Sequence, residues 1–263
     1  MSATDPRPPA SQPAAELFEF LCRMGDNTLV LGHRLSEWCG TAPALEEDIA
    51  TANTALDLIG QTQMWLGLAA ETEGAGRSAD DLAMTRDAWD FRNLLLVEQP
   101  NGDFGRTLMR SFLFDAWHRL MLERLTLSGD PRVAAIAAKA VKEVAYHADR
   151  SAELVVALGD GTEESHGRMQ AALDRLWPYA GEMLADDAID RAMAEAGIAP
   201  LPSALADPWE ESVRTTLTRA TLTVPEGAFA HRGGKDGARH SEHLGHMLTT
   251  MQWLQRAYPG ARW

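Results

Sequence analysis

Apolar residues recur along this chain every three to four positions, the spacing that places them on one face of an α-helix. Such patterns run from end to end, whereas apolar and polar residues never alternate over more than a few positions, as they would in a half-buried strand. The sequence therefore predicts an all-α protein. Four segments have the length of bundle helices: residues 15–39, 44–72, 104–128 and about 130–159.

The predicted helices differ in how their apolar residues are arranged. In segment 44–72 a repeat every seven residues, with two apolar residues beside it, marks an apolar face: Leu45, Ala52, Ile59 and Leu66, with Ile49 and Leu56. Segment 104–128 is apolar nearly all round, which predicts a central helix or one that buries two faces. The last segment has Asp130 as its cap, Pro131 at its first position and Gly159 at its end.

The connections between these helices predict the topology. Short turns rich in Gly and Pro join the first helix to the second and the third to the fourth, so each pair is predicted to be an antiparallel hairpin. Some 30 residues separate the two hairpins, enough for a crossover along the bundle. Two hairpins and one long crossover between helices two and three make a ferritin-like four-helix bundle.

The rest of the chain predicts a leader and an extension. Residues 1–14 carry four prolines and almost no large apolar groups, so we expect a flexible leader. We expect a single ferritin-like helical domain at 15–263, with its core bundle at about 15–160 and a helical extension at about 161–263. The additional C-terminal helices are predicted near residues 165–184, 186–196, 207–220 and 240–256.

Charge and cysteine content narrow the class of protein. With 24 basic and 38 acidic residues, the formal net charge is −14, which argues against nucleic acid or an anionic membrane as a partner. Cys22 and Cys39 are too few for a disulfide framework, and their scarcity fits a reducing compartment, so we expect a cytoplasmic protein. No stretch has the length and apolar character of a secretory signal or a membrane span.

A ferritin-like bundle raises the question of a di-iron centre. Such a centre needs one Glu from each of two helices and a Glu-x-x-His pair from each of the other two. On a helical wheel the first helix has Thr28 as the only polar member of its core stripe, and Glu37 projects to the far side. On the second helix, Asp57 lies at the stripe margin and the residue three positions later is Gly60.

The second predicted hairpin keeps more of the pattern without completing it. Asp115 lies on an apolar face, with Arg119 one turn later as the expected neutralising partner. Glu143 and His147 are both expected to face inward, but their spacing is Glu-x-x-x-His. At most three carboxylates and one histidine would face the interior, too few for two oxygen-activating irons. We therefore expect a degenerate site without metal, and we favour a hydrogen-bonded buried pair over a mononuclear metal site for Glu143 and His147.

Two C-terminal features have alternative interpretations. On a helix, His240, His243 and His246 would fan over about 120°, which suits a metal poorly, and we favour a capped surface or interface helix over a metal site. The neighbouring stretch GGKDG is too short for a phosphate loop. We expect a tight turn that fixes the last helix.

One stretch of the crossover, residues 86–104, is unusual for a linker. Arg86 and Arg92 bracket Trp89 and Phe91, residue types that pair with phosphates and stack on an adenine ring. The alternative is an apolar strap over the bundle whose charges lie in water, and we favour it because two neighbouring aspartates could pair with the same arginines.

Long segments of the chain resemble a known family. These are LGHRLSEWCGTAPALEEDIATANTALDLIGQ, NLLLVEQPNGDF, AAIAAKAVKEVAYH and GGKDGARHSEHLGHMLTTMQWLQRAYPG. Together they are similar to the C subunits of the bacterial phenylacetyl-CoA epoxidases (ring 1,2-epoxidases), from about Gly25 to Trp263.

The resemblance implies a structural subunit of a monooxygenase complex. In that family, an iron-free ferritin-like subunit pairs with a homologous catalytic A subunit that carries the di-iron centre. The complex epoxidises the aromatic ring of phenylacetyl-CoA in aerobic phenylacetate catabolism, using O₂ and electrons from NADPH that arrive through a reductase subunit. No catalytic, cofactor-binding or metal residue is then expected in this chain, and a contact with the CoA tail would involve the segment from Arg86 to Arg92.

Two other interpretations remain open from the residues. The chain could be an active di-iron oxidoreductase in its own right, if residues outside the expected positions complete a site. It could also be a free-standing helical ligand-binding or storage protein without a heterologous partner. For the subunit hypothesis, the apolar helix 104–128 is the expected element shared between the core and an interface.

Overall fold

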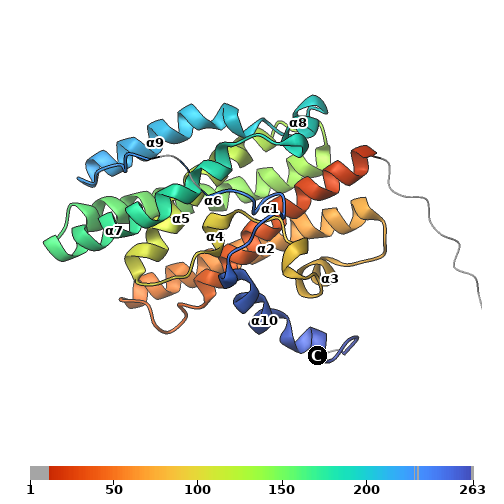
Figure 1. Cartoon of the computed structure of the whole chain (residues 1–263), viewed down its shortest axis with the longest axis horizontal. Helices are drawn as coiled ribbons and strands as arrows, with labels where there is room; N and C mark the ends of the chain where they lie inside the picture. The colour runs from red at the N-terminus through yellow and green to blue at the C-terminus, as the bar shows by residue number, and fades with distance from the viewer. Residues whose placement is uncertain (1–11, 228, 230, 262–263) are drawn as a thin grey trace, which may run out of the picture.

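The structure, a computed structural model, describes residues 12–227, 229 and 231–261, and every regular element within them is helical. Four long helices form the core (Figure 1): α1 (Gln12–Ser36), α2 (Leu45–Glu73), α5 (Phe104–Leu125) and α6 (Pro131–Gly159). Each lies within three residues of its predicted bounds. The prediction of an all-α, ferritin-like arrangement is confirmed.

Local capping explains where these helices begin and end. The carboxylate of Asp103 accepts a hydrogen bond from the backbone of Arg106, and that of Asp130 accepts one from the backbone of Arg132. At the end of α2, Gly74 adopts a left-handed conformation with φ of 64°, which favours glycine. The predicted leader lies outside the described residues except for its last three positions, where α1 has already begun.

The first hairpin packs tightly because α1 carries a small residue at the contact. A Cβ atom at Gly25 would lie 2.5 Å from Cδ2 of Leu66 on α2. One turn later, the hydroxyl groups of Thr28 and Thr62 lie 2.8 Å apart in the buried interface. This close approach leaves the opposite side of α2 facing outward.

The apolar face predicted for α2 is split, because Leu66 is completely buried whereas three of its other residues face outward. Leu45, Ile49 and Leu56 are 72%, 53% and 69% exposed. The buried side of the helix mixes apolar residues with hydroxyl and amide groups: Thr51, Thr54, Ala55, Leu58, Gln61, Thr62, Trp65 and Leu66. The expectation was wrong for Leu45, Ile49 and Leu56 because a pattern of apolar residues alone does not count threonine and glutamine as core residues.

The crossover between the hairpins contains short helical turns. Residues 74–103 include α3 (Ala79–Met84), the 3-10 turn η1 (Ala88–Asp90) and α4 (Leu95–Glu98). Phe91, Leu96 and Val97 are completely buried. The crossover is therefore part of the core, as an apolar strap would be. The expectation that its charges lie in water is wrong for Arg86, which is buried and paired with Asp26.

The C-terminal part covers the second hairpin. Its helices are α7 (Glu163–Ala180), α8 (Ala188–Glu195), α9 (Ala206–Arg219) and α10 (Glu242–Ala257), with 3-10 turns η2 (Gly181–Leu184) and η3 (Pro202–Leu205). Helices α7 and α9 lie along the side of the bundle opposite α2 (Figure 1), and both contact α5. The indole nitrogen of buried Trp209 on α9 donates to the carbonyl of Leu113, 3.2 Å away.

Helix α5 is consequently enclosed by the chain's own helices. Most of its side chains are buried, including Phe112, Leu113 and Phe114. The prediction of a central buried helix is confirmed, and the expectation that the same helix contributes to an interface is wrong, because α6, α7 and α9 already cover it.

Helix α10 projects from the body of the molecule (Figure 1) and is joined to it by residues 231–241, which we call the C-terminal strap. One carboxylate oxygen of buried Glu182 accepts hydrogen bonds from the backbone nitrogens of Gly233, Gly234 and Lys235, at 2.8, 2.7 and 3.1 Å. Its other oxygen accepts from the backbone nitrogen of Leu95 at 2.9 Å. The GGKDG stretch is a turn that anchors the last helix, as predicted.

Across the described ranges, helices of sufficient length lack the hydropathy needed to cross a bilayer.

Candidate functional site

The residues that the sequence analysis compared with di-iron ligands lie between α2, α5 and α6. Nε2 of His147 lies 2.9 Å from Oδ2 of Asp57. One turn along α2, the amide of Gln61 donates to Oε2 of Glu143 over 3.1 Å. Where a di-iron protein places inward ligands, these two helices are joined by pairs of polar side chains.

A third polar contact joins α2 to α6, and we call the three contacts between these helices the polar seam. The guanidinium group of Arg150 on α6 forms an ion pair with the carboxylate of Glu47 on α2. The hydrogen-bond partners of His147 and Glu143 are thus Asp57 and Gln61 on α2. The seam therefore has three polar contacts, and each of them joins α2 to α6.

Asp115 is the most buried carboxylate of the group. Its residue is 2% exposed, and desolvation raises the pKa of the carboxyl from its usual value near 3.8 to about 6. His147, a hydrogen bond from Ser151, and Arg150 lower the pKa by less than burial raises it. Asp115 is thus a carboxyl group held near its point of half-ionisation at mildly acidic pH.

The expected pairing of Asp115 with Arg119 is wrong. Arg119 instead bonds Glu123 at 3.0 Å and Asp149 at 2.9 Å on the surface. Its long stem carries the guanidinium group into water, whereas the short side chain of Asp115 remains inside the bundle. No arginine on α5 neutralises this carboxyl group among the described contacts.

His118 belongs to the site and was missed in the sequence. It is completely buried, neither ring nitrogen has a hydrogen-bond partner among the described residues, and its ring lies 5.0 Å from that of Phe114. Burial, and to a smaller extent the nearby His147, lower the pKa of His118 to about 3, so the ring is neutral. The signal was the spacing Asp115-x-x-His118, which is the ligand pattern with Asp in place of Glu.

These residues do not fit a metal centre. Over the described part of the chain, no three or more His, Cys, Asp or Glu side chains are grouped closely enough to hold a metal ion. The Nε2 atom of His147 and one oxygen of Glu143 are already engaged by side chains of α2. Binding two irons here would require breaking those contacts, and Asp57, Asp115 and Glu143 supply fewer carboxylates than the four of a ferritin-like di-iron centre.

The space beside Asp115 is also too small for a substrate. The cavity has a volume of about 20 Å³, and its lining includes the hydroxyl-bearing residues Thr54, Ser111 and Ser151. That volume holds about one water molecule, whereas ligand pockets measure about 300–1,000 Å³. The interior can solvate the carboxyl of Asp115 but cannot admit an aromatic thioester.

The two arginines proposed for CoA contact are already bonded within the chain. The guanidinium group of Arg86 forms an ion pair with the buried carboxylate of Asp26, and it lies 4.5 Å from the ring centre of Phe91. Nε of Arg92 lies 2.6 Å from Oε1 of Glu19. Of the four residues, Arg86 and Phe91 are buried, Arg92 is half-buried and Trp89 is 65% exposed. A CoA contact stays a prediction that depends on Trp89 and Arg92.

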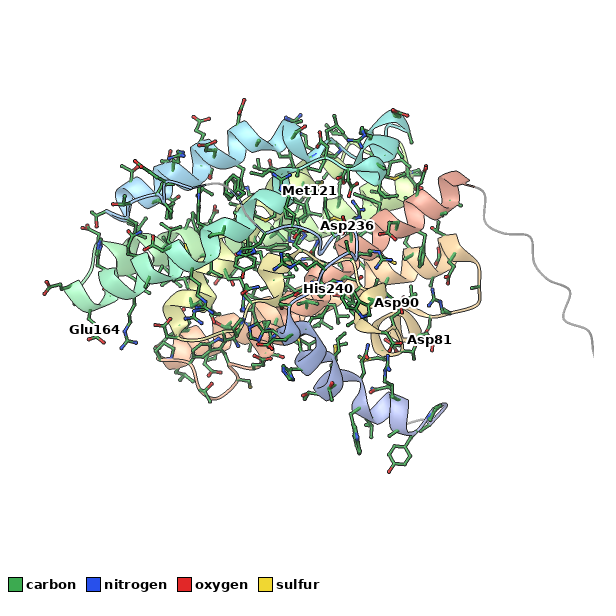
Figure 2. All side chains as sticks on the ribbon, viewed as in Figure 1. Asp81, Asp90, Met121, Glu164, Asp236 and His240 are labelled. Atoms are coloured by element: carbon green, nitrogen blue, oxygen red, sulfur yellow. The ribbon has the colours of Figure 1, made fainter. Side chains whose placement is uncertain are left out.

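The three histidines near α10 do not converge. Nδ1 of His240 lies 2.5 Å from Oε1 of Glu98, and its Nε2 lies 3.2 Å from the carbonyl of Phe91. His240 lies where α10 joins the bundle (Figure 2), whereas His243 is half-buried and His246 is exposed on the helix. Glu98, which is completely buried, also accepts from the backbone of Ser241 and was not expected from the sequence.

Two comparisons with known proteins agree with the resemblance seen in the sequence. The family model described as phenylacetic acid catabolic protein matches residues 1–263. The chain is also 49% identical over 248 residues to the C subunit of the 1,2-phenylacetyl-CoA epoxidase of Escherichia coli (strain K12). That alignment covers 94% of this chain and 99% of the Escherichia coli protein, and the resemblance is confirmed.

Proposed function

The chain belongs to the phenylacetic acid catabolic protein family, and we propose that it is a non-catalytic, structural subunit of a phenylacetyl-CoA epoxidase. Its relative is named as the C subunit of that enzyme. The complex would epoxidise the ring of phenylacetyl-CoA in aerobic phenylacetate catabolism. This chain would support the homologous catalytic A subunit.

One observation carries the non-catalytic assignment: the ligand positions are used for contacts between α2 and α6. Asp57 with His147, and Glu143 with Gln61, hold the helices where a di-iron protein would hold metal. Inserting one oxygen atom of O₂ into an aromatic ring and reducing the other to water takes two electrons. A metal centre that manages this chemistry needs several free carboxylate and imidazole ligands, which favours a catalytic site on another chain.

The remaining parts of the proposal concern the complex. The di-iron centre would lie on the catalytic subunit, and NADPH would supply electrons through a reductase subunit. This chain would bind no cofactor of its own. We place the complex in the cytoplasm, where CoA thioesters and NADPH are available, and we propose no nucleic-acid or membrane partner for it.

Copurification with a metal assay on each chain tests this function. The chain is expressed with the catalytic subunit, the complex is isolated, and the iron in each separated chain is measured. We expect a stable complex with iron in the catalytic chain alone. A Glu143→Gln variant, which keeps a side chain that can bond Gln61, is expected to leave ring epoxidation by the complex unchanged.

Each alternative function predicts a different outcome. Two irons per purified chain, lost in Glu143→Gln, would instead indicate an active di-iron oxidoreductase. A protein that remains free of the catalytic subunit under all conditions would indicate a free-standing ligand-binding protein. Either result would overturn the structural-subunit proposal.

A further inference from the structure

The strongest unassigned feature of the surface is the apolar outer side of α2. Eight large apolar side chains are exposed among the described residues, and four of them lie on α2 and α6. We call these four residues the α2 face: Leu45, Ile49 and Leu56 on α2 and Tyr146 on α6. Tyr146 is 59% exposed.

The charge pattern of α2 shows that the face is not an ordinary solvated helix surface. Between Asp48 and Glu71, a stretch of 22 residues, Asp57 is the only charged residue, and its carboxylate is bonded to His147. The exposed apolar residues repeat at spacings of four and seven. An outward helix side with this spacing and almost no charge is typical of a helix that packs against another helix.

The face extends from α2 to α6 through the polar seam. Leu56 immediately precedes Asp57, and Tyr146 immediately precedes His147, whose side chains are bonded across the seam. Leu56 and Tyr146 therefore lie on neighbouring helices at the same level, both exposed. Gly60, one turn beyond Leu56, adds an open position where a Cβ would meet nothing within 4 Å, so another backbone can approach closely.

The area suits a docking site formed by both helices. The charge-poor stretch of α2 is about 33 Å long at 1.5 Å per residue, and a helix is about 10 Å wide. One helix thus offers roughly 330 Å², and two helices side by side about twice that, against the ~800 Å² that each partner contributes to a stable interface. A partner must cover both α2 and α6.

The charges near the α2 face indicate whether it binds a second copy of this chain or a different chain. Exposed acidic residues lie at both ends of the α2 stretch, at Glu46 and Glu71. A two-fold contact presents the same patch from both copies. Whether the two α2 helices run parallel or antiparallel, an acidic end then meets an acidic end, and two chains of net charge −14 each repel.

We propose that the α2 face docks a helical surface of the catalytic subunit of the epoxidase complex. That surface has apolar residues at helical spacing and carries Lys or Arg opposite Glu46 and Glu71. The inference rests on the proposed function, because it needs a heterologous subunit, and it goes further by assigning the face. It also relocates the interface from α5, which the chain covers itself, to α2 and α6.

Charge substitutions on this face test the proposal. Leu56→Glu and Ile49→Glu are compared with Leu127→Glu, whose parent residue is 80% exposed in the turn between α5 and α6. All three positions are exposed, so circular dichroism and thermal unfolding of the isolated chains should match the wild type. We expect the two α2 variants to bind the catalytic subunit about a hundred-fold more weakly, as for central interface residues, and Leu127→Glu to bind as the wild type does.

A second variant tests the charge argument. Glu46→Lys combined with Glu71→Lys is expected to weaken binding to a basic partner and to make its salt dependence shallower. In a homodimer, like charges would face each other both before and after the change, so the reversal of charge would not weaken self-association.

The outcomes separate the proposal from the function on which it rests. If the wild type binds the catalytic subunit and Leu56→Glu and Ile49→Glu bind equally well, the α2 face is not the docking site, although the proposed function stands. If the folded wild type binds no other subunit, the proposed function fails. A wild-type homodimer that Leu56→Glu dissociates would identify a second copy as the occupant and overturn the proposal.

Discussion

We predict that removing the negative charge of the buried Asp115 side chain stabilises the protein. Its pKa is raised from about 3.8 to about 6 by burial between α5 and α6. The folded state therefore holds the proton more tightly than the unfolded chain does. Below pH 4 the carboxyl group of Asp115 is protonated in both the folded and the unfolded state, so it does not lower the stability. Above pH 6 the folded state must contain a poorly solvated carboxylate, which lowers the stability.

The magnitude follows from the shift in pKa. About two pKa units correspond to about 3 kcal/mol, at 1.36 kcal/mol per unit. An Asp115→Asn substitution keeps the shape of the side chain and removes its charge. At pH 8 the variant should be more stable than the wild type by up to about 3 kcal/mol, which for a chain of this length raises the melting temperature by about 5 °C.

The pH dependence distinguishes this mechanism from a general improvement in packing. Urea unfolding is measured at pH 4, 6 and 8 for the wild type, Asp115→Asn and the surface control Asp149→Asn. The gain of Asp115→Asn should be absent at pH 4 and should grow through pH 6, while the control, whose side chain is 69% exposed, changes little. Equal or lower stability of Asp115→Asn at pH 8 would refute the reasoning.

Two further predictions use other buried polar groups. Burial lowers the pKa of His118 to about 3, so between pH 7 and pH 4 this histidine binds a proton in the unfolded chain but not in the folded one. The variant His118→Met should therefore lose about 3 kcal/mol less stability over this pH range than the wild type does. Chemical unfolding at both pH values measures the difference. Glu182→Ala should destabilise the fold by about 3 kcal/mol and speed tryptic cleavage after Lys235, since four backbone N–H groups lose their acceptor. The control is Glu164→Ala, at an exposed position (Figure 2). Equal cleavage rates in the two variants would contradict the anchoring role of Glu182.

The helix bounds were predictable because their signals are local. Asp130 caps α6 through the backbone two residues later, and Pro131 occupies the first helical position. The wrong orientation of α2 arose from residues whose polarity is satisfied within the helix. Thr62 is buried, and its hydroxyl donates to the carbonyl of Leu58 at 2.9 Å, so a polar side chain lies in the core at little cost.

The candidate site was only partly predictable. Sequence spacing identified Glu143 and His147 as inward residues, but which turn of α2 lies opposite them depends on how the two hairpins dock. The bonds of Asp57 with His147 and of Gln61 with Glu143 join residues 90 and 82 positions apart. Spacing along one helix gives no information about such a register.

Buried carboxylates of the crossover and η2 had no local signal at all. Glu98 is bonded to His240, 142 positions later, and Glu182 to backbone groups about 50 positions later. Both residues follow ordinary helical or turn sequences and look like surface residues. Only the folded chain shows that each is completed by the C-terminal strap.

The strap also sets an order of events during protein synthesis. A ribosome makes Glu98 and Glu182 well before it makes residues 233–241, which supply most of their partners. Until the strap emerges, these two carboxylates lack most of their partners, and burying them in that state would be strongly disfavoured. The region around Glu98 and Glu182 is therefore expected to reach its final packing only after residues 233–241 have been synthesised.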